Sequence, residues 1–568
     1  MIERTVESDG PAPGMWGRDL LLLALAFGLL NFLLLGRLPL ANPDEARYAE
    51  IPREMLAAGD WVTPRLNDVP YFEKPPLVYW TVAVSRILFG PGDFAARLTP
   101  ALFGLGGILL TYAAGRRLYN RTTGLAAAVV LGTCLIYFAL SRILLIDMAV
   151  SVLVSATLFC FILGVNEPSG PRRRWWFCGL YAAAALATLA KGLIGFALPG
   201  AVMFLWLLIF NQWRRLLPMY LPSGAALFLV IAAPWHLLAA QRNPGWAHFY
   251  FVHEHWERFT TTTHGRSAPF WYFVPILLLG LFPWVGFLFS SVREAVAGGW
   301  ARRRENATAW FLLTWVGFIF LFFSKSQSKL IPYILPVFPA LAVLIGAWVA
   351  RRWAERKVSP LRVELRVFAF LAGLLGAALL ITVLKPGLIR DTEQAEAVRP
   401  YGLAMGAVLL VGGVLAPWFG RRRGVLAGLG TVVVTIVAFY VGLLLAAPGL
   451  NRPSTRDLAV VAREKIKPAD AVFHYWGFFH DFVYYSGRAV GLVNHLDELE
   501  VQFLPPAELA TRFIKEDELR RQWAGPGRVW VLVRKRDQQD PQSVFADPAF
   551  RYHLIAETPA FSLVSNQP

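Results

Sequence analysis

Charged residues are scarce in this chain of 568 residues. Lys, Arg, Asp and Glu make up 16% of it, whereas soluble domains carry about a quarter. Hydrophobic residues reach 56%, which excludes an ordinary soluble globule. Cysteine is nearly absent, because only Cys134, Cys160 and Cys178 occur, all inside apolar runs and without partners at metal-binding spacing. We therefore expect no disulfide framework.

The basic residues outnumber the acidic ones and give a formal net charge of +17. The arginines form short clusters between apolar runs, which is the pattern of cytoplasmic loops and not of a nucleic-acid surface. A Gly-rich phosphate loop is missing from the polar tail. We expect no nucleic-acid partner and no nucleotide cofactor.

Apolar runs long enough to cross a bilayer recur along the chain and predict an α-helical polytopic membrane protein with about 13 transmembrane helices. The first run is too long for a signal peptide and predicts a retained span. The predicted spans are Leu20–Leu38, Phe94–Ala114, Gly124–Ser141, Met148–Val165, Trp176–Leu189, Leu193–Phe210, Tyr220–Ala240, Trp271–Ser290, Ala309–Phe323, Leu330–Ala350, Val363–Val383, Tyr401–Phe419 and Val425–Ala446.

Arginine clusters fall in alternate loops, and the positive-inside rule assigns those loops to the cytoplasm. The N-terminus then lies inside, and the tail lies outside, in the periplasm of a bacterial inner-membrane protein. We predict a membrane domain over 1–450, with large outer loops at 39–93 and 241–270, and a soluble domain over 451–568. The stretch Leu77–Phe89 is short and predicts an interfacial helix.

The tail alternates short β-type runs with helical patterns, which favours a small periplasmic α/β domain with a partly parallel sheet. The predicted strands lie at 471–476, 489–493 and 529–533, and the predicted helices at 455–465 and 506–523.

Charged residues gather on the outer side of the spans. A charge beside hydrocarbon costs desolvation free energy, so such residues usually have a function. Asp44 and Glu45 follow the first span, and the alternative for them is simply a helix start. Arg47, near the same end, favours phosphate binding, with a carboxylate as a general base. Glu73-Lys74 is either an interfacial ion pair or a phosphate ligand beside a group that binds a cation or a sugar amine.

Asp147 lies between two apolar runs and is either a helix cap or a buried functional carboxylate, with Lys191 on the same side as its partner. Lys325 and Lys329 are basic residues in an outer loop, against the positive-inside bias, and predict anion binding. His253 and His255 are only two residues apart, which is a weak metal pattern.

These motifs, in this order over roughly residues 20–350, resemble those of the lipid A aminoarabinose transferases, which are GT-C glycosyltransferases. The matching motifs are Pro43-Asp44-Glu45-Ala46-Arg47-Tyr48-Ala49-Glu50, Gly59-Asp60-Trp61, Tyr71-Phe72-Glu73-Lys74-Pro75, Asp147, Lys191-Gly192, Glu254-His255 with Arg258-Phe259, Ala268-Pro269-Phe270-Trp271-Tyr272, and Lys329 with Tyr333.

The resemblance implies transfer of 4-amino-4-deoxy-L-arabinose from undecaprenyl phosphate to a lipid A phosphate, with inversion, and with it polymyxin resistance. Its implied partners are this donor, lipid A and inner-membrane lipids, and we expect a monomer. Its implied site consists of the catalytic residues Asp44, Asp147 and Glu45, the substrate-binding residues Arg47, Tyr48, Tyr71, Lys74, Lys191, Arg258, Lys329 and Tyr333, and Glu73 with His255 or His253 for a divalent cation, zinc. His253 has no counterpart in the family pattern, so both histidines stay candidates.

Two alternatives remain. Another GT-C enzyme, such as a protein O-mannosyltransferase, shares the fold but acts on a polypeptide. A lipid-linked sugar flippase places charges near the bilayer midplane and often shows repeats. Here the charges lie at one face and no repeat appears.

Overall fold

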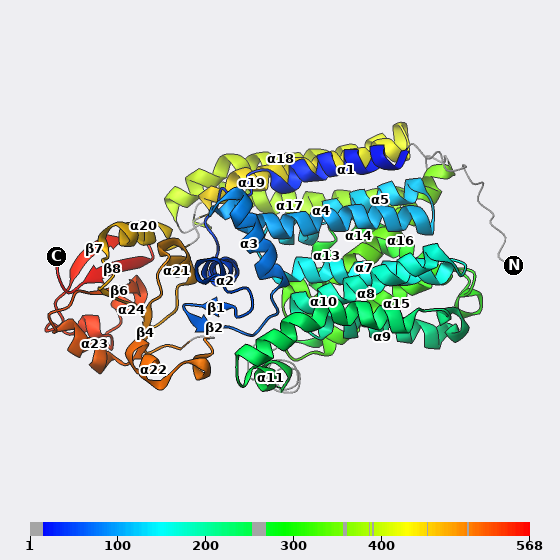
Figure 1. Ribbon diagram of the computed structural model, residues 1–568. Helices are drawn as coiled ribbons and strands as arrows, with labels where there is room; N and C mark the ends of the chain where they lie inside the picture. Colours follow the sequence, from blue (N-terminus) through cyan, green and yellow to red (C-terminus); the bar gives the residue numbers. More distant parts are fainter. Residues whose placement is uncertain are drawn as a thin grey trace. The chain divides into compact units, whose positions relative to one another are not determined.

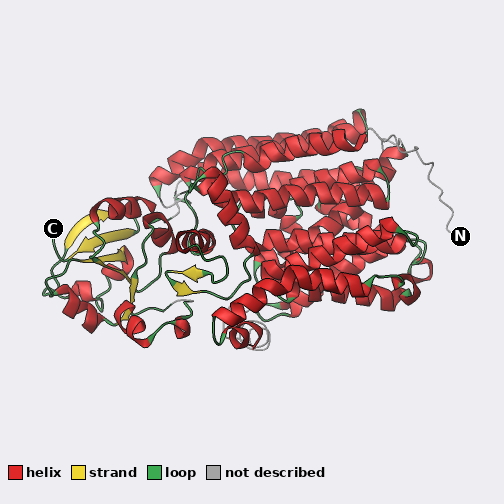
Figure 2. Ribbon diagram, viewed as in Figure 1, coloured by secondary structure: helices red, strands yellow, loops and turns green. Residues whose placement is uncertain are grey.

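A computed structural model describes residues 15–252, 268–355, 361–385, 387–388, 391–450, 453–496 and 499–568. The chain forms two compact units (Figures 1 and 2). Unit 1 comprises residues 1–35, 97–237 and 251–450, and unit 2 comprises 36–96, 238–250 and 451–568. Residues 39–93, the first predicted outer loop, thus belong to the same compact unit as the tail.

Unit 1 is helical, because a backbone surrounded by lipid must satisfy its hydrogen bonds within each segment. Helices α4 and α10 each have one end in unit 2. The main helices are α1 (Met15–Phe32), α4 (Asp93–Leu118), α5 (Arg121–Thr133), α6 (Leu135–Leu140), α7 (Ile146–Asn166), α8 (Pro171–Lys191), α9 (Ile194–Phe210), α10 (Leu221–Arg242), α13 (Phe273–Gly280), α14 (Val285–Ala295), α15 (Ala307–Lys325), α16 (Phe338–Ala354), α17 (Arg362–Leu384), α18 (Thr392–Arg422) and α19 (Val425–Ala446). The short helix η5 (Ile331–Val337) leads directly into α16.

Every predicted span overlaps a helix or a broken helix. Among the described residues, nine helices are long and apolar enough to cross a membrane, and one bent pair brings the number to ten. The remaining three predicted spans correspond to the broken pair α5 and α6, to α8, which carries three arginines and a lysine, and to α9, which has only 17 residues. The total of 13 therefore stays a prediction at these three places.

The eighth predicted span, Trp271–Ser290, is not a straight helix. Helices α13 and α14 meet at an angle of 109°, and the break contains Pro283, which lacks the N–H that a continuous helix needs. The amide of Leu135, at the break between α5 and α6, donates to the carbonyl oxygen of Phe282 at 3.1 Å. The indole of Trp284 donates to the Thr133 hydroxyl at 2.9 Å. Polar groups at each helix break thus form hydrogen bonds with the other break, so neither break leaves them facing lipid.

In unit 2, the first outer loop forms α2 (Asp44–Ala58), a small hairpin of β1 (Arg65–Leu66) and β2 (Val69–Pro70), and α3 (Leu77–Phe89). Asn67 and Asp68 both have positive φ, which suits the tight turn of a two-residue hairpin. The buried carboxylate of Glu54 accepts both of their amides, at 2.7 and 3.0 Å. The prediction of a helix over Leu77–Phe89 is confirmed.

The tail folds around a six-stranded sheet in the order β5-β4-β3-β6-β8-β7. The strands β5, β4, β3 and β6 pair in parallel, and β8 pairs antiparallel with both β6 and β7. This arrangement confirms the partly parallel sheet. The strands are β3 (Ala471–Tyr475), β4 (Gly491–Val493), β5 (Phe513–Ile514), β6 (Val529–Arg534), β7 (His553–Glu557) and β8 (Phe561–Ser565), and the helices are α20 (Arg456–Lys465), α21 (His480–Ser486), α22 (Pro506–Arg512), α23 (Glu516–Trp523) and α24 (Lys535–Gln538).

The single helix predicted over residues 506–523 is wrong. The segment contains two helices, α22 and α23, separated by strand β5. Phe513 and Ile514 pair with β4, so sheet formation overrides the local helical pattern. The sequence pattern also missed β7 and β8.

Candidate functional site

The acidic motif after the first span forms the first turn of α2 in unit 2. Glu45 is buried, and its carboxylate accepts the backbone amide of Ala41 at 3.0 Å, so that it caps the turn where the helix begins. The Asp44 side chain is 52% exposed and pairs with Arg47 one turn later. Of the two predicted carboxylates here, Asp44 is therefore the one that a substrate can reach, while Glu45 shapes the helix start.

Arg47 is buried beneath this accessible carboxylate. Its guanidinium lies 5.1 Å from the ring centre of Tyr48. Burial disfavours the charged form, but the neighbouring acidic groups, among them the carboxylates of Glu73 and Asp44, outweigh it and raise the pKa of Arg47 well above its ordinary value. Arg47 is thus a permanent, largely desolvated cation, and its attraction for an anion is correspondingly strong.

Two buried phenols line the same region of unit 2. Burial raises the pKa of Tyr71 and of Tyr79 well above the ordinary value, so both hydroxyls are neutral hydrogen-bond donors. The Tyr79 ring lies 6.2 Å from that of Tyr48, and the Tyr79 hydroxyl has no hydrogen-bond partner among the described residues. A buried donor of this kind fits a polar ligand group. Sequence reasoning placed Tyr79 only within the predicted interfacial helix Leu77–Phe89, because nothing in its local pattern marks it as a ligand-binding residue.

Glu73 and Lys74 form the second charged pair of unit 2. The Lys74 ammonium donates to the Glu73 carbonyl oxygen at 2.8 Å and lies 3.4 Å from the Glu73 carboxylate. Their side chains are 13% and 12% exposed. The pair is therefore much more desolvated than an ordinary ion pair at the protein surface, which was the alternative hypothesis for Glu73 and Lys74.

The tail holds the loop that carries this pair. The Asn67 side chain and the Val490 backbone exchange two hydrogen bonds, at 2.9 and 2.8 Å. Both carboxylate oxygens of buried Glu500 lie 3.0 Å from the Phe72 amide nitrogen, next to the pair. Glu500 is thus a positioning residue for Lys74. Sequence reasoning missed it, since 428 residues separate Glu500 from Phe72.

Unit 1 holds the other predicted carboxylate. Asp147 lies in the first turn of α7 and pairs with Lys191, the last residue of α8. The Lys191 ammonium also lies 4.6 Å from the ring centre of Tyr333 in η5. The two side chains of the pair are 14% and 17% exposed. The predicted partnership of Asp147 and Lys191 is present, and Tyr333 joins it.

Lys329 is buried and already engaged with backbone oxygens. Its ammonium donates to the carbonyls of Ala268 and Ser326, at 2.9 and 2.5 Å. Those bonds fasten the turn that precedes η5. Lys325, at the end of α15, is exposed. Anion binding by these lysines stays a prediction.

The histidine-rich loop lies outside the described residues, and with it His253, His255 and Arg258. Of the residues implied for a divalent cation, only Glu73 is described, and its carboxylate faces the cations Lys74 and Arg47. No group of three or more His, Cys, Asp or Glu able to hold a metal ion occurs within the described part of the chain.

Comparison with known proteins adds to this geometry. A family model described as dolichyl-phosphate-mannose-protein mannosyltransferase matches residues 73–237. The undecaprenyl phosphate-α-4-amino-4-deoxy-L-arabinose arabinosyl transferase of Edwardsiella ictaluri is 35% identical over 353 residues, which is 62% of either chain. The enzyme of the same name from Aeromonas salmonicida is 33% identical over 430 residues, covering 73% of this chain and 75% of the relative. This chain belongs to that arabinosyl transferase family.

A solved structure agrees with this membership. ArnT from Cupriavidus metallidurans, in a crystal structure with bound undecaprenyl phosphate, is 30% identical, with a TM-score of 0.82 over 96% of this chain and 97% of that chain. An oligosaccharyltransferase from Archaeoglobus fulgidus, at 12% identity and a TM-score of 0.50, shares the fold alone. The predicted GT-C fold is confirmed.

Proposed function

We propose that this chain transfers 4-amino-4-deoxy-L-arabinose from undecaprenyl phosphate to a phosphate group of lipid A. An oxygen of the acceptor phosphate attacks the anomeric carbon, and the bond from that carbon to the carrier phosphate breaks. The carrier leaves with the bonding electron pair, and the configuration inverts. The observation that carries the proposal is the pairing of desolvated cations and carboxylates in unit 2, in a chain of this family.

The donor contains both an anionic phosphate and a cationic sugar amine, and the site offers a partner for each. Arg47 and Lys74 bind the carrier phosphate and stabilise the charge that it gains on leaving. Asp44, the exposed carboxylate, binds the sugar ammonium. Tyr71 and Tyr79 contribute neutral donors to phosphate or sugar oxygens. Asp44 and Glu73 compensate the charges of buried Arg47 and of partly buried Lys74.

No strong acid or base is required for this transfer. A phosphate leaves without protonation, and the acceptor phosphate is already ionised near neutral pH. Asp44 is therefore an electrostatic anchor in this proposal and not a proton acceptor. In unit 1, Lys191 with Tyr333 supplies a further cation and a phenol for an anionic substrate group, and Asp147 orients Lys191.

A divalent cation, zinc, remains part of the proposal through Glu73 and the histidine of the loop at 253–255. When bound, it would stabilise phosphate charge. The residues near Glu73 fit a metal poorly, because two cations already compensate its carboxylate. No step is assigned to the metal.

The match to the protein mannosyltransferase family model favours one alternative, transfer of a polyprenyl-phosphate sugar to a protein hydroxyl. A hydroxyl must lose a proton, so that reaction needs a general base, whereas transfer to phosphate does not. The two functions therefore differ in what Asp44 must do.

Mass spectrometry of lipid A tests the proposal directly. Cells that lack the gene for this chain, and the same cells with it restored, are compared for aminoarabinose on lipid A phosphates and for polymyxin survival. We expect both to depend on the chain. Unchanged lipid A would overturn the assignment, and sugar on periplasmic proteins would establish the alternative.

We further propose that the chain is a monomer in the bacterial inner membrane, with unit 2 in the periplasm. The alternation of arginine clusters along the sequence supports this orientation. A reporter that is active only in the periplasm, fused after Pro568, should be active. Activity of a cytoplasmic reporter at that position would reverse the orientation.

A further inference from the structure

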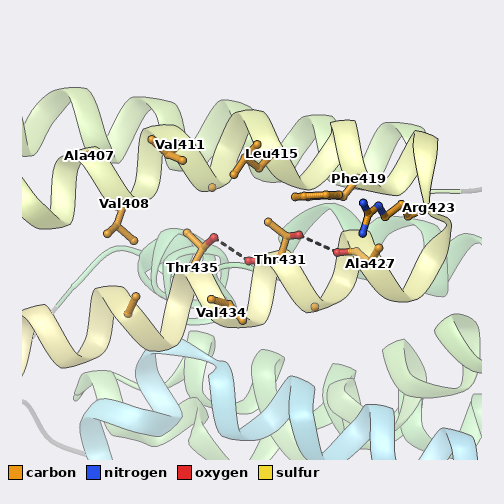
Figure 3. Close-up of a pocket in the computed structure, with 13 residues that line it drawn as sticks. Ala407, Val408, Val411, Leu415, Phe419, Arg423, Ala427, Thr431, Val434 and Thr435 are labelled. Atoms are coloured by element: carbon orange, nitrogen blue, oxygen red, sulfur yellow. Dashed lines mark hydrogen bonds between the residues drawn. The ribbon is translucent and has the colours of Figure 1, made fainter.

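Helices α18 and α19 form a groove that is lined by none of the site residues considered so far. It has a volume of about 720 Å³ and is lined by residues of these two helices and the turn between them (Figure 3). Small residues hollow it out. A side chain added at Gly430 would meet no heavy atom within 4 Å of its Cβ. The space is large enough for a hydrocarbon chain.

The walls of the groove offer almost no directional polar contact. Val411 and Val434 are 56% and 69% exposed along it. The hydroxyls of Thr431 and Thr435 donate to the Ala427 and Thr431 carbonyl oxygens, at 2.8 and 2.7 Å, as Figure 3 shows. With those hydroxyls engaged, the body of any occupant is apolar.

One end of the groove is basic. Arg423 lines it, just past the end of α18, and its guanidinium lies 5.7 Å from the ring centre of Phe419 (Figure 3). Arg421 and Arg422 precede it in the chain. Within the described ranges, no carboxylate forms an ion pair with any of these three arginines. The positive-inside rule assigns such a cluster to the cytoplasmic leaflet.

We propose that this groove binds an anionic phospholipid of the cytoplasmic leaflet, with an acyl chain between α18 and α19 and the phosphate at Arg423. The proposal rests on charge complementarity, because a basic cluster at the end of an apolar groove between transmembrane helices matches an anionic headgroup with its attached chain. A zwitterionic lipid brings no net charge to the arginines. The site is independent of the proposed transferase reaction, since none of its residues belongs to the transfer site.

The lipid joins the two helices, so its binding stabilises the folded protein. The experiment uses the full chain in detergent, with thermal unfolding and native mass spectrometry as readouts. Phosphatidylglycerol, phosphatidylcholine of the same acyl chains and undecaprenyl phosphate are added separately. We expect phosphatidylglycerol to raise the unfolding temperature more than phosphatidylcholine does and to persist as a bound adduct.

Two variants and two matched controls locate the effect. Gly430→Leu fills the groove without a clash, and Gly373→Leu adds the same side chain in α17, also with no heavy atom within 4 Å. Arg423→Gln removes the basic end, and Arg362→Gln removes an exposed arginine at the start of α17. We expect Gly430→Leu to lower phosphatidylglycerol affinity more than tenfold and Arg423→Gln to lower it about fivefold. The two controls should behave as the wild type.

Each alternative result decides against the proposal. Equal stabilisation by phosphatidylcholine would show that binding does not depend on an anionic headgroup. Stabilisation by undecaprenyl phosphate that is lost in Gly430→Leu makes the groove a carrier site, because the transfer site would bind this lipid equally in that variant. Retained phosphatidylglycerol affinity in Gly430→Leu or in Arg423→Gln places the lipid elsewhere on the protein.

Discussion

Glu500 offers the sharpest test of how unit 2 holds its reactive loop. Its carboxylate is 5% exposed, and both of its oxygens lie 3.0 Å from the Phe72 amide nitrogen, two residues before Lys74. Glu500→Ala removes a charged acceptor from a buried donor, which costs about 1.5–3 kcal/mol. A middle value of about 2 kcal/mol shifts the equilibrium between fastened and released loop roughly 30-fold, since each 1.36 kcal/mol is a factor of ten.

Glu500→Ala should therefore lower kcat/KM for the lipid-linked sugar by about 10- to 100-fold. Glu500→Gln keeps a neutral acceptor oxygen and should recover most of the loss, because a neutral hydrogen bond still satisfies the amide. The assay follows sugar transfer to lipid A by the purified full chain, with KM and kcat for the donor measured separately. A raised donor KM in Glu500→Ala that Glu500→Gln largely reverses is the expected signature of misplaced Lys74.

Glu557→Ala serves as the matched control. Glu557 is a tail carboxylate, 53% exposed, that pairs with Lys535 at 2.8 Å. An exposed pair of this kind contributes at most about 1 kcal/mol, so the control should keep wild-type kinetics. If Glu500→Ala has a kcat/KM within twofold of the wild type, the tail does not position the loop and the reasoning is refuted.

Four further outcomes follow from named contacts. Asp44→Asn should weaken binding of the aminoarabinose donor but not of bare undecaprenyl phosphate; wild-type donor affinity with lost turnover would instead make Asp44 a general base. Lys74→Ala should abolish polymyxin resistance at equal protein level and Lys74→Arg should keep part of it, while full resistance in Lys74→Ala excludes the phosphate role. Asp147→Asn combined with Lys191→Met should cost less activity than the sum of the two single changes, as a double-mutant cycle of transfer rates will reveal; strict additivity contradicts their pairing. Burial, with nearby His480, holds the pKa of His474 well below its ordinary 6.5. The contribution of the neutral His474 ring to the free energy of unfolding is therefore complete above pH 6.5 and declines as the pH falls below it. An unfolding temperature of the tail that does not fall between pH 7.5 and pH 5 would argue against this.

Local sequence patterns sufficed for most of the membrane helices and for the strands β3, β4 and β6. Long apolar runs have few options in lipid, and β3, β4 and β6 are short runs rich in apolar residues. The break between α13 and α14 and the strand β5 escaped such reasoning. Both depend on partners distant in the chain, namely the α5–α6 break that satisfies Phe282 and the β4 edge that pairs with Phe513.

The candidate site divides in the same way. Motifs and apolar runs were enough to assign the family, the membrane class and the charged residues to consider, because desolvated charges beside apolar runs are costly and conspicuous. Only the tertiary structure separated exposed Asp44 from the buried helix cap Glu45, and engaged Lys329 with carbonyl oxygens. The contact of Glu500 with Phe72 was found only in the folded chain. Burial and hydrogen-bond partners depend on contacts between segments hundreds of residues apart, and a local sequence pattern contains no information about them.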